Sequence, residues 1–232
     1  MSEAIEALRG GLVVSVQAAP DSPLAETALM VALARAAEAG GAAGIRAEGA
    51  GDVAAIKEAV ELPVIGLRKR RTAGSEVYIT PELEDARAVA AAGADVLAVD
   101  ATLRARPGGQ DAASFLGVLA DEVPLPVLAD IDSLEAGLAA RAAGAAAVAT
   151  TLSGYTEGSA IPSGPDLELV AALAARLDCP VLAEGRIATP EQARAAFDAG
   201  AFAVVVGTAI TDPVALTRGF AATAGRSAHA TR

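Results

Sequence analysis

One pattern recurs along this chain and constrains its fold more than any other feature: a helix-forming stretch ends in Ala-Gly, and a short β-branched run follows. The pairs that end these stretches are Ala39-Gly40, Ala92-Gly93, Ala143-Gly144 and Ala199-Gly200. Glycine at the end of a helix adopts the left-handed conformation that closes it. Each pair therefore predicts the boundary between a helix and the strand after it.

Other strands begin near a proline, which is tolerated there because the start of a strand needs no ladder donor. Eight strands are expected in all, at Leu12–Gln17, Ala43–Arg46, Leu62–Lys69, Val96–Asp100, Leu125–Asp130, Ala147–Thr151, Cys179–Gly185 and Ala203–Thr208. Eight helices are expected between and after them, at Leu24–Glu38, Gly51–Val60, Pro81–Ala92, Asp111–Glu122, Ser133–Ala143, Asp166–Leu177, Pro190–Ala199 and Pro213–Ala222.

Eight alternations of strand and helix predict an α/β protein with a single closed (β/α)8 TIM barrel, of the ribulose-phosphate-binding type. We expect residues 1–224 to form the barrel and residues 225–232 to form a disordered C-terminal tail. The length of 232 residues suits one such domain. The alternative is an open doubly wound sheet, which is disfavoured because no Gly-x-Gly-x-x-Gly motif follows the first strand.

Composition excludes several classes of function. A net charge of −11, from 18 basic and 29 acidic residues, argues against nucleic acid as a partner. The N-terminal residues are charged and no apolar run is long enough to span a membrane, so we expect a cytoplasmic protein with no membrane partner. The chain has a single cysteine, Cys179, which excludes an internal disulfide framework. Its single histidine, His229, lies in the expected tail and argues against catalysis by a Ser/His or Cys/His pair.

In a barrel of this kind the active site lies at the C-terminal ends of the strands. Nearly every expected strand ends in side chains suited to binding or chemistry, namely Gln17, Arg46, Lys69, Asp100, Asp130, Thr150, Thr151, Glu184, Gly207 and Thr208. Because unpaired charge is costly to bury, this convergence indicates a functional site. Asp100 and Asp130 have three open interpretations: they bind sugar hydroxyls, pair with Lys69, or hold a metal, for which two carboxylates without histidine are a weak signal.

The chain has only two lysines, and one of them stands at a strand end. Lys57 falls within a predicted helix, which is typical of a solvated face. Lys69 ends the third expected strand, among three arginines. A lysine whose pKa is lowered by cations or burial exchanges a proton near neutral pH, which an arginine does not. Lys69 is therefore expected to be a general base or a Schiff-base amine.

Glycines after the last two strands predict loops that bind an anion. Gly185 and Arg186 follow the seventh expected strand, and Gly207 and Thr208 end the eighth. These two loops are the usual phosphate site of such barrels, because glycine lets backbone N–H groups approach the anion. The alternative is a pair of ordinary strand-to-helix turns. A phosphorylated small molecule is the expected partner.

Motifs spread over most of the chain resemble one known family. They include Gly11-Leu-Val-Val-Ser-Val-Gln17, Ser75-Glu-Val-Tyr-Ile-Thr-Pro81, Ala98-Val-Asp-Ala-Thr-Leu-Arg104, Thr150-Thr-Leu-Ser-Gly-Tyr-Thr156 and Ala183-Glu-Gly-Arg-Ile187. In unbroken order from about Gly10 to Ala222, the chain resembles the N-acetylmannosamine-6-phosphate 2-epimerases. The two stretches that contain Asp-Ala-Thr-Leu-Arg and Thr-Thr-Leu-Ser-Gly-Tyr-Thr are specific to that family.

The resemblance implies an isomerase that interconverts N-acetylmannosamine 6-phosphate and N-acetylglucosamine 6-phosphate in amino-sugar and sialic acid catabolism. It implies a homodimer, a phosphorylated amino-sugar substrate, and no metal or organic cofactor. By the same resemblance Lys69 moves the carbon 2 proton and Glu184 assists ring opening or proton relay. The implied substrate-binding residues are Gln17, Arg46, Asp130 and Tyr155 for the acetamido group and hydroxyls, and Gly185, Arg186, Gly207 and Thr208 for the phosphate.

Two residues depart from the family pattern. Asp212 stands where the family usually carries an arginine expected near the phosphate, and it is placed to cap the last helix before Pro213. Arg68 replaces an apolar residue and would lower the pKa of Lys69 further only if its side chain points inward. Two rival functions remain open: a class I aldolase that uses Lys69 as a Schiff base, and a sugar-phosphate sensor that has lost activity through Asp212.

Overall fold

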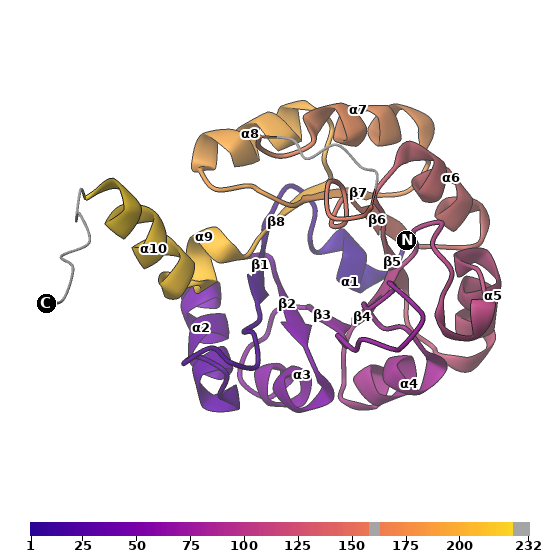
Figure 1. Ribbon diagram of the computed structural model, residues 1–232, viewed down its shortest axis with the longest axis horizontal. Helices are drawn as coiled ribbons and strands as arrows, with labels where there is room; N and C mark the ends of the chain where they lie inside the picture. The colour runs from indigo at the N-terminus through magenta and orange to yellow at the C-terminus, as the bar shows by residue number, and fades with distance from the viewer. Residues whose placement is uncertain (158–162, 225–232) are drawn as a thin grey trace, which may run out of the picture.

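The computed structural model describes residues 1–157 and 163–224. Within them eight parallel strands pair in sequence order, and β1 pairs with β8 to close the barrel (Figure 1). The strands are β1 (Leu12–Val16), β2 (Gly44–Glu48), β3 (Val64–Leu67), β4 (Val96–Asp100), β5 (Val127–Asp130), β6 (Ala147–Ala149), β7 (Val181–Glu184) and β8 (Ala203–Val206). The predicted (β/α)8 barrel is confirmed, and the open sheet is excluded. The expected tail at residues 225–232 lies outside the described residues.

Seven of the helices, α2 to α8, form a ring around the strands, while α1 lies across one end of the barrel and α9 and α10 lie to one side (Figure 1). They are α1 (Glu3–Glu6), α2 (Thr27–Ala39), α3 (Ala50–Lys57), α4 (Leu83–Ala91), α5 (Ala112–Glu122), α6 (Leu134–Ala142), α7 (Leu167–Arg176), α8 (Pro190–Asp198), α9 (Thr208–Thr211) and α10 (Pro213–Thr223). The short α1 and α9 were not predicted, because four residues are too few to show a helical period. In the described chain no helix combines the length and apolarity needed to cross a membrane, and the cytoplasmic location stays a prediction.

The end of the third strand differs from its prediction. β3 ends at Leu67, not at Lys69. Beyond it the chain pairs antiparallel with the loop that leads to α4: Lys69 bridges Ile79, and the N–H of Thr80 donates to the carbonyl of Arg68 at 2.6 Å. This loop segment fits between the ends of β3 and β4, so the parallel ladder stops two residues early. Lys69 remains at the C-terminal rim of the barrel.

Capping residues set the starts of several helices as predicted, with one exception. The side chains of Ser133 and Thr189 accept hydrogen bonds from the first turns of α6 and α8. The prediction that Thr80 caps a helix beginning at Pro81 was wrong. α4 begins at Leu83 with Glu82 as its cap, whereas Thr80 is buried and adopts a left-handed backbone with φ +46°.

The interior of the barrel is an apolar core closed at its N-terminal end by α1. Successive strand residues point alternately inward and outward, and the inward set joins Ile5 and Leu8 of the N-terminal segment in one buried cluster. Gly44 leaves the space that Leu8 occupies, because a Cβ at position 44 would stand 2.5 Å from Leu8 Cδ2. With this floor in place, the opposite end of the barrel is free to carry polar groups.

A substitution at this floor is expected to destabilise the barrel. In Gly11→Ala the new methyl group would stand 2.3 Å from Ala43 Cβ, which has no rotamer to relax into. We expect the free energy of unfolding, measured in urea, to fall by about 1–3 kcal/mol. The control is Gly51→Ala in α3, where nothing lies within 4 Å of the new Cβ. Equal stability of the two variants would contradict this account of the packing.

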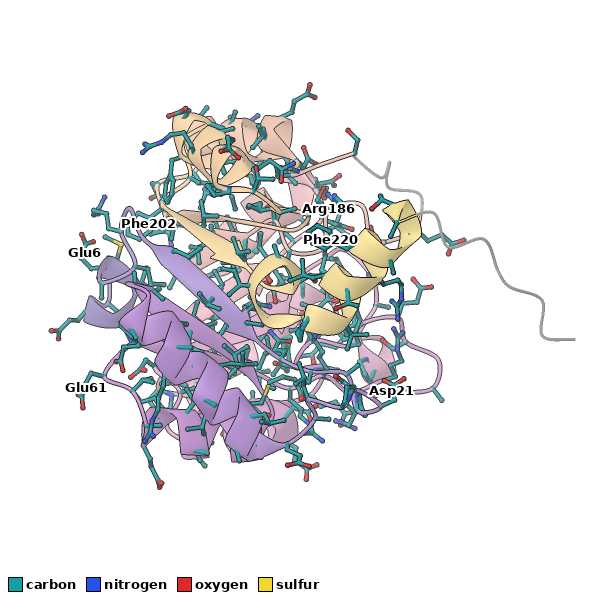
Figure 2. All side chains as sticks on the ribbon, turned by 90° about the vertical axis from the view of Figure 1, so that its left-hand side faces the viewer. Glu6, Asp21, Glu61, Arg186, Phe202 and Phe220 are labelled. Carbon is teal, nitrogen blue, oxygen red and sulfur yellow. The ribbon has the colours of Figure 1, made fainter. Side chains whose placement is uncertain are left out.

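The two ends of the barrel differ in how they are covered. Figure 2 shows Glu6 and Phe202 at one end and Arg186, Asp21 and Phe220 at the other. α10 projects away from the barrel (Figure 1), has no buried residue, and leaves Phe220 77% exposed. The end of the barrel at which the strands terminate is therefore flanked by a helix whose apolar side chains face solvent.

Candidate active site

A cavity of about 660 Å³ opens at the C-terminal ends of the strands. Its walls come from the ends of β1, β7 and β8 and from the segments that follow β3, β6, β7 and β8. They include Ser15, Lys69, Thr151, Tyr155, Glu184, Gly185, Arg186, Gly207 and Thr208. A narrower recess of about 200 Å³ adjoins it and adds Gln17, Arg46 and Tyr78 to the lining. Most of the predicted strand-end residues thus gather in one place, as the barrel geometry requires. Asp100, Asp130 and Thr150 are buried and are not among the lining residues.

A buried ion-pair network forms the floor of this site. Both terminal nitrogens of Arg46 donate to the carboxylate of Asp130, at 3.0 and 2.6 Å, and Arg46 also lies 3.2 Å from Glu184. The hydroxyl of Thr151 lies 2.6 Å from Asp130 and 3.1 Å from Glu184. Arg46 and Asp130 are almost completely shielded from water. A bidentate pair of this kind holds both side chains in one orientation.

Lys69 brings its amine to the edge of this network. Its side chain reaches solvent through the open cavity. The surrounding protein nevertheless desolvates the ammonium, and this effect, with the positive charge of Arg46, lowers the pKa of Lys69 below 10.5. The carboxylates of Glu184, Glu48 and Asp130 oppose the shift. Within the described residues no carboxylate forms an ion pair with Lys69, so its amine is free to act on a ligand.

Glu184 is shifted in the opposite sense. Burial raises the pKa of Glu184 above 4.5, and Asp130 adds to the rise, while Arg46, Thr151 and Lys69 oppose it. The two pKa values thus approach each other, because burial disfavours the charged form of both groups. Two groups with shifted pKa values in one cavity are typical of general acid–base chemistry.

The loops after β7 and β8 present backbone groups to the cavity. Gly185 has φ +111°, a backbone conformation that residues with a side chain rarely adopt. A Cβ added at this position would lie 3.8 Å or more from its neighbours, so backbone conformation rather than lack of space favours glycine here. α9 begins at Thr208, directly after Gly207. The first N–H groups of a helix lack partners inside it and suit an anion. This arrangement fits the phosphate site expected after strands seven and eight.

Arg186 contacts protein groups at this loop. Its guanidinium donates to the carbonyls of Ser153 at 2.7 Å and Gly164 at 2.9 Å. It also lies 5.0 Å from the ring centre of Tyr155, whose side chain is 58% exposed at the cavity rim. Arg186 therefore ties the loop after β6 to the loop after β7 while it lines the cavity.

Comparisons with known proteins point in one direction. A family model described as "Putative N-acetylmannosamine-6-phosphate epimerase" matches residues 30–226. A relative of that name from Cutibacterium acnes is 50% identical over 218 residues, which are 93% of this chain and 94% of the relative. The solved N-acetylmannosamine-6-phosphate 2-epimerase from Clostridium perfringens superimposes with a TM-score of 0.92 at 39% identity, over 96% of each chain.

The chain belongs to the N-acetylmannosamine-6-phosphate 2-epimerase family. The resemblance stated from the sequence motifs is thereby confirmed. A further relative, a bifunctional enzyme NanE/NanK from Brucella suis, is 49% identical over 95% of this chain, which matches 41% of that longer protein. A thiamine phosphate pyrophosphorylase from Pyrococcus furiosus, at 20% identity and a TM-score of 0.56, shares the fold alone.

In this 2-epimerase family member one strand-end carboxylate is not part of the cavity. Asp100 is completely buried and pairs with Arg104 at 2.7 Å, and it also accepts from the hydroxyl of Thr102 at 2.8 Å. Of the three roles considered for Asp100, binding of sugar hydroxyls and pairing with Lys69 do not fit this buried pair with Arg104. Among residues 1–157 and 163–224 no group of three histidine, cysteine or acidic side chains is placed to hold a metal.

Ser15 and Tyr78 line the site but were not among the predicted site residues. Ser15 accepts a hydrogen bond from the amide of Gln17 at 2.8 Å and lines both parts of the cavity. Its signal was available, because Ser15 is two residues before Gln17 and shares its face of the strand. Tyr78 enters the recess from the loop before α4, where no strand-end rule points to it. Burial beside Asp130 raises the pKa of Tyr78.

The two departures from the family pattern take definite positions. Arg68 points outward, lies 3.6 Å from Glu48 and is half exposed, so it follows the outward alternative. Asp212 caps α10, because its carboxylate accepts from the N–H of Ala215 at 2.9 Å. It also lines the recess that contains Lys69 and Thr208. Its negative charge therefore lies beside the expected phosphate site.

Proposed function

We propose that this chain interconverts N-acetylmannosamine 6-phosphate and N-acetylglucosamine 6-phosphate by removing and returning the proton on carbon 2. The observation that carries the proposal is the common cavity of Lys69, Glu184 and the glycine loops after β7 and β8. An amine base, a carboxyl group and an anion site in one cavity are what this reaction needs. Family membership supplies the identity of the sugar.

The chemistry requires an acidic carbon–hydrogen bond. The proton on carbon 2 becomes acidic once the sugar ring opens and carbon 1 is a carbonyl, because the electrons left on carbon 2 then pass to the carbonyl oxygen. In the proposal, neutral Lys69 takes this proton and becomes an ammonium. Nearby positive charge from Arg46 and the new ammonium stabilises the enolate oxygen. Return of the proton to the other face of carbon 2 gives the epimer.

Glu184 serves the steps that flank this transfer. Its raised pKa keeps a protonated carboxyl available at higher pH than an ordinary glutamate, so it donates a proton to the ring oxygen during ring opening. Because the pKa of Lys69 is lowered and that of Glu184 is raised, a proton passes between them at a small free-energy difference. This exchange would let Lys69 regain or lose a proton between its removal of the carbon 2 proton and the return of a proton to the opposite face of carbon 2.

The remaining predicted residues hold the substrate in the proposal. Gln17 carries a buried side-chain oxygen without a partner in the described chain, which suits the N–H of an acetamido group. Arg46 and Asp130 present a fixed pair to the sugar hydroxyls, and Tyr155 closes the rim. The phosphate is held by backbone N–H groups of Gly185, Gly207 and Thr208 and by the charge of Arg186.

The deciding experiment incubates the protein with N-acetylmannosamine 6-phosphate in heavy water and follows carbon 2 by proton NMR. We expect the epimer to form and deuterium to enter at carbon 2. Neither epimer nor deuterium after prolonged incubation would refute the proposal. Borohydride is then added with the substrate present. Covalent trapping of substrate on Lys69 would favour the aldolase reaction over epimerisation.

The pH dependence of the reaction should respond to Glu48. Neutral Lys69 is the base, so the rate rises with pH as Lys69 loses its proton. The Glu48 carboxylate raises the pKa of Lys69, and Glu48→Gln removes that charge. Glutamine still accepts the backbone N–H of Lys69, now 3.0 Å from the carboxylate. We therefore expect the rise in kcat/KM to move to lower pH.

The measurement is the profile of kcat/KM between about pH 6 and about pH 10. Glu61→Gln, which removes an exposed carboxylate in the turn before β3, is the control and should leave the profile in place. A profile of Glu48→Gln that stays fixed or moves to higher pH would show that Lys69 is not the group titrated.

Asp212 should weaken substrate binding through its charge. Asparagine caps a helix about as well as aspartate but carries no charge. Asp212→Asn is therefore expected to lower KM for the phosphorylated sugar by about 2–5-fold at low ionic strength, and by less in high salt. Steady-state kinetics at two salt concentrations check this. Asp178→Asn, a charge removed at the far end of the barrel, is the control, and the same fall in KM there would assign the effect to net charge.

We also propose that the protein is a homodimer in which each copy receives α10 of the other. α10 exposes Val214, Leu216 and Phe220. An apolar groove of about 440 Å³ lies between α8 and the outer face of β8, lined in part by Phe197 and Val204. An uncovered apolar helix and an uncovered apolar groove on one chain complement each other in a two-fold pair. Exchange of α10 would cover both.

Light scattering after size exclusion tests the dimer. We expect a mass of two chains for the wild type and of one chain for Phe220→Asp. A second variant that ends at Asp212 lacks the helix altogether and should behave in the same way. A monomeric wild type at high micromolar concentration would overturn the proposal and would indicate that α10 folds back onto its own groove.

A further inference from the structure

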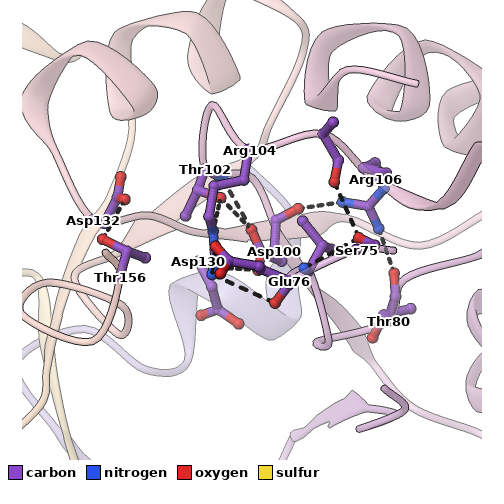
Figure 3. Close-up of polar contacts among 12 residues, drawn as sticks. Ser75, Glu76, Thr80, Asp100, Thr102, Arg104, Arg106, Asp130, Asp132 and Thr156 are labelled. Carbon is purple, nitrogen blue, oxygen red and sulfur yellow. Dashed lines mark hydrogen bonds and ion pairs between the residues drawn. The ribbon is translucent and has the colours of Figure 1, made fainter. Parts of the chain in front are cut away.

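Arg106 is a buried arginine in an unusual setting. Its side chain is 2% exposed, and within the described residues its guanidinium forms no ion pair with a carboxylate. Instead it donates to two backbone carbonyls, those of Asp100 and Thr80 (Figure 3). Its guanidinium carbon lies 3.7 Å from the ring centre of Phe115 on α5. Burial lowers the pKa of Arg106 to about 10, so keeping this cation here is costly.

One of the two carbonyls belongs to the strained turn at Thr80. Thr80 has φ +46°, a conformation that side chains other than glycine's rarely adopt and that a β-branched residue disfavours most. Its carbonyl does not take part in the strand pairing at the ends of β3 and β4, and it accepts a hydrogen bond from Arg106. Without Arg106 this carbonyl would be buried without a donor. The hydroxyl of Thr80 donates to the carbonyl of Ala98 at 2.7 Å. These bonds together hold the turn in place.

The same turn holds the backbone on both sides of Lys69. The hydroxyl of Thr80 accepts the N–H of Arg68 at 3.1 Å, and the N–H of Thr80 donates to the carbonyl of Arg68. The next pair along the segment links the N–H of Arg70 to the carbonyl of Tyr78 at 2.9 Å. Lys69 stands between these bonds and faces Ile79. Arg68 and Arg70 point outward to carboxylates, so Lys69 is the residue that turns inward.

We propose that Arg106 is a positioning residue for Lys69, which it sets in the cavity by fixing the turn at Thr80. The proposal rests on the function proposed above, in which Lys69 moves the carbon 2 proton. Arg106 itself does not line the cavity and touches no part of the substrate site. A planar guanidinium is needed because its fork reaches two carbonyls at once, whereas an ammonium is a single point of charge.

This role predicts a particular kinetic pattern. The phosphate loops follow β7 and β8, on the other side of the barrel, so loss of Arg106 leaves substrate binding nearly intact. Without Arg106, the Lys69 side chain would occupy its position in the cavity for less of the time, and its amine would be better hydrated. Its charged neighbours are Arg46 and Glu48 on β2, Asp130 on β5 and Glu184 on β7. Greater distance from Arg46 and contact with water both favour the ammonium form of Lys69. The rise in kcat with pH, called the pH limb below, therefore moves to higher pH.

The experiment compares Arg106→Met and Arg106→Lys with the wild type in the carbon 2 exchange assay. For Arg106→Met we expect kcat to fall by about 10–100-fold with KM within about threefold of the wild type, and the rise in kcat with pH to lie at higher pH. Arg106→Lys keeps the charge and one bond and should recover part of kcat. If Arg106→Met does not fold, the same pH shift in Arg106→Lys decides the question.

Gly11→Ala controls for lost stability, because it weakens the barrel at the end farthest from the cavity. It should leave the pH limb in place. A normal kcat and pH limb in both Arg106 variants, or a fall in kcat with a stationary limb, would overturn the positioning role. These outcomes are read against an active wild type. A wild type that exchanges no proton at carbon 2 would instead refute the proposed function.

Discussion

Lys69→Met is expected to slow the exchange of the carbon 2 proton by about 10²–10⁴-fold, the usual contribution of a positioned acid or base. Methionine has nearly the length of lysine but no group that accepts a proton. The Arg46, Asp130 and Glu184 network does not use the Lys69 amine as a partner, so the rest of the site should persist. Binding of the substrate, measured by calorimetry, should therefore change little.

The chain supplies its own control for this variant, because it has only one other lysine. Lys57 lies at the end of α3 and pairs with Asp95 at 2.8 Å, at a partly exposed site away from the cavity. Lys57→Met should keep its exchange rate. Exchange that survives in Lys69→Met would assign the proton transfer to another group that lines the cavity, and Glu184 and Tyr78 would be tested first.

Arg46→Met is expected to lower the free energy of unfolding by about 3–5 kcal/mol, because it leaves the Asp130 carboxylate buried without its cation. Activity should be lost as well, since Arg46 both lowers the pKa of Lys69 and stabilises the enolate in the proposal. Urea unfolding gives the stability, and the exchange assay gives the activity. Arg141→Met, which breaks an exposed pair with Asp178, is the matched control and should change the stability little.

The double variant Arg46→Met, Asp130→Leu separates the two effects. With both charges gone, the buried site contains apolar groups of similar size, and most of the stability should return. Activity should not return, because the positive charge beside Lys69 is still missing. A double variant as unstable as Arg46→Met would show that shape, rather than an unpaired charge, governs this part of the barrel.

The parts of the fold that repeat were predictable from the sequence. Seven of the eight expected strands begin at a local signal, either an Ala-Gly pair or a proline. The barrel then places all strand ends at one rim, so Lys69, Arg46 and Glu184 could be grouped from the sequence alone. The same rule misjudged Asp100. Its side chain is at the correct rim, but Arg104, from the loop directly after it, pairs with it. Strand-end position alone does not reveal which charges are already neutralised.

The features that were missed depend on contacts between segments without a period. The antiparallel pairing of Lys69 with Ile79 brings Tyr78 into the recess, and neither helix nor strand periodicity marks that loop. Thr80 followed by proline reads locally as a helix start, yet Arg106 and Ala98 hold it in a left-handed turn. Such overrides of local preference concentrate around functional sites.

The lowered pKa of Lys69 places position 69 under opposing selective pressures. A lysine whose pKa is lower in the folded chain than in the unfolded chain reduces stability fully below its folded pKa. The reduction fades as pH rises toward 10.5, where the unfolded chain also releases the proton. Sequence design that rewards thermostability alone would therefore exchange this lysine for an apolar residue. In the proposed function such a barrel would be more stable but would no longer epimerise the sugar, so the design of heat-resistant variants should keep residue 69 constant.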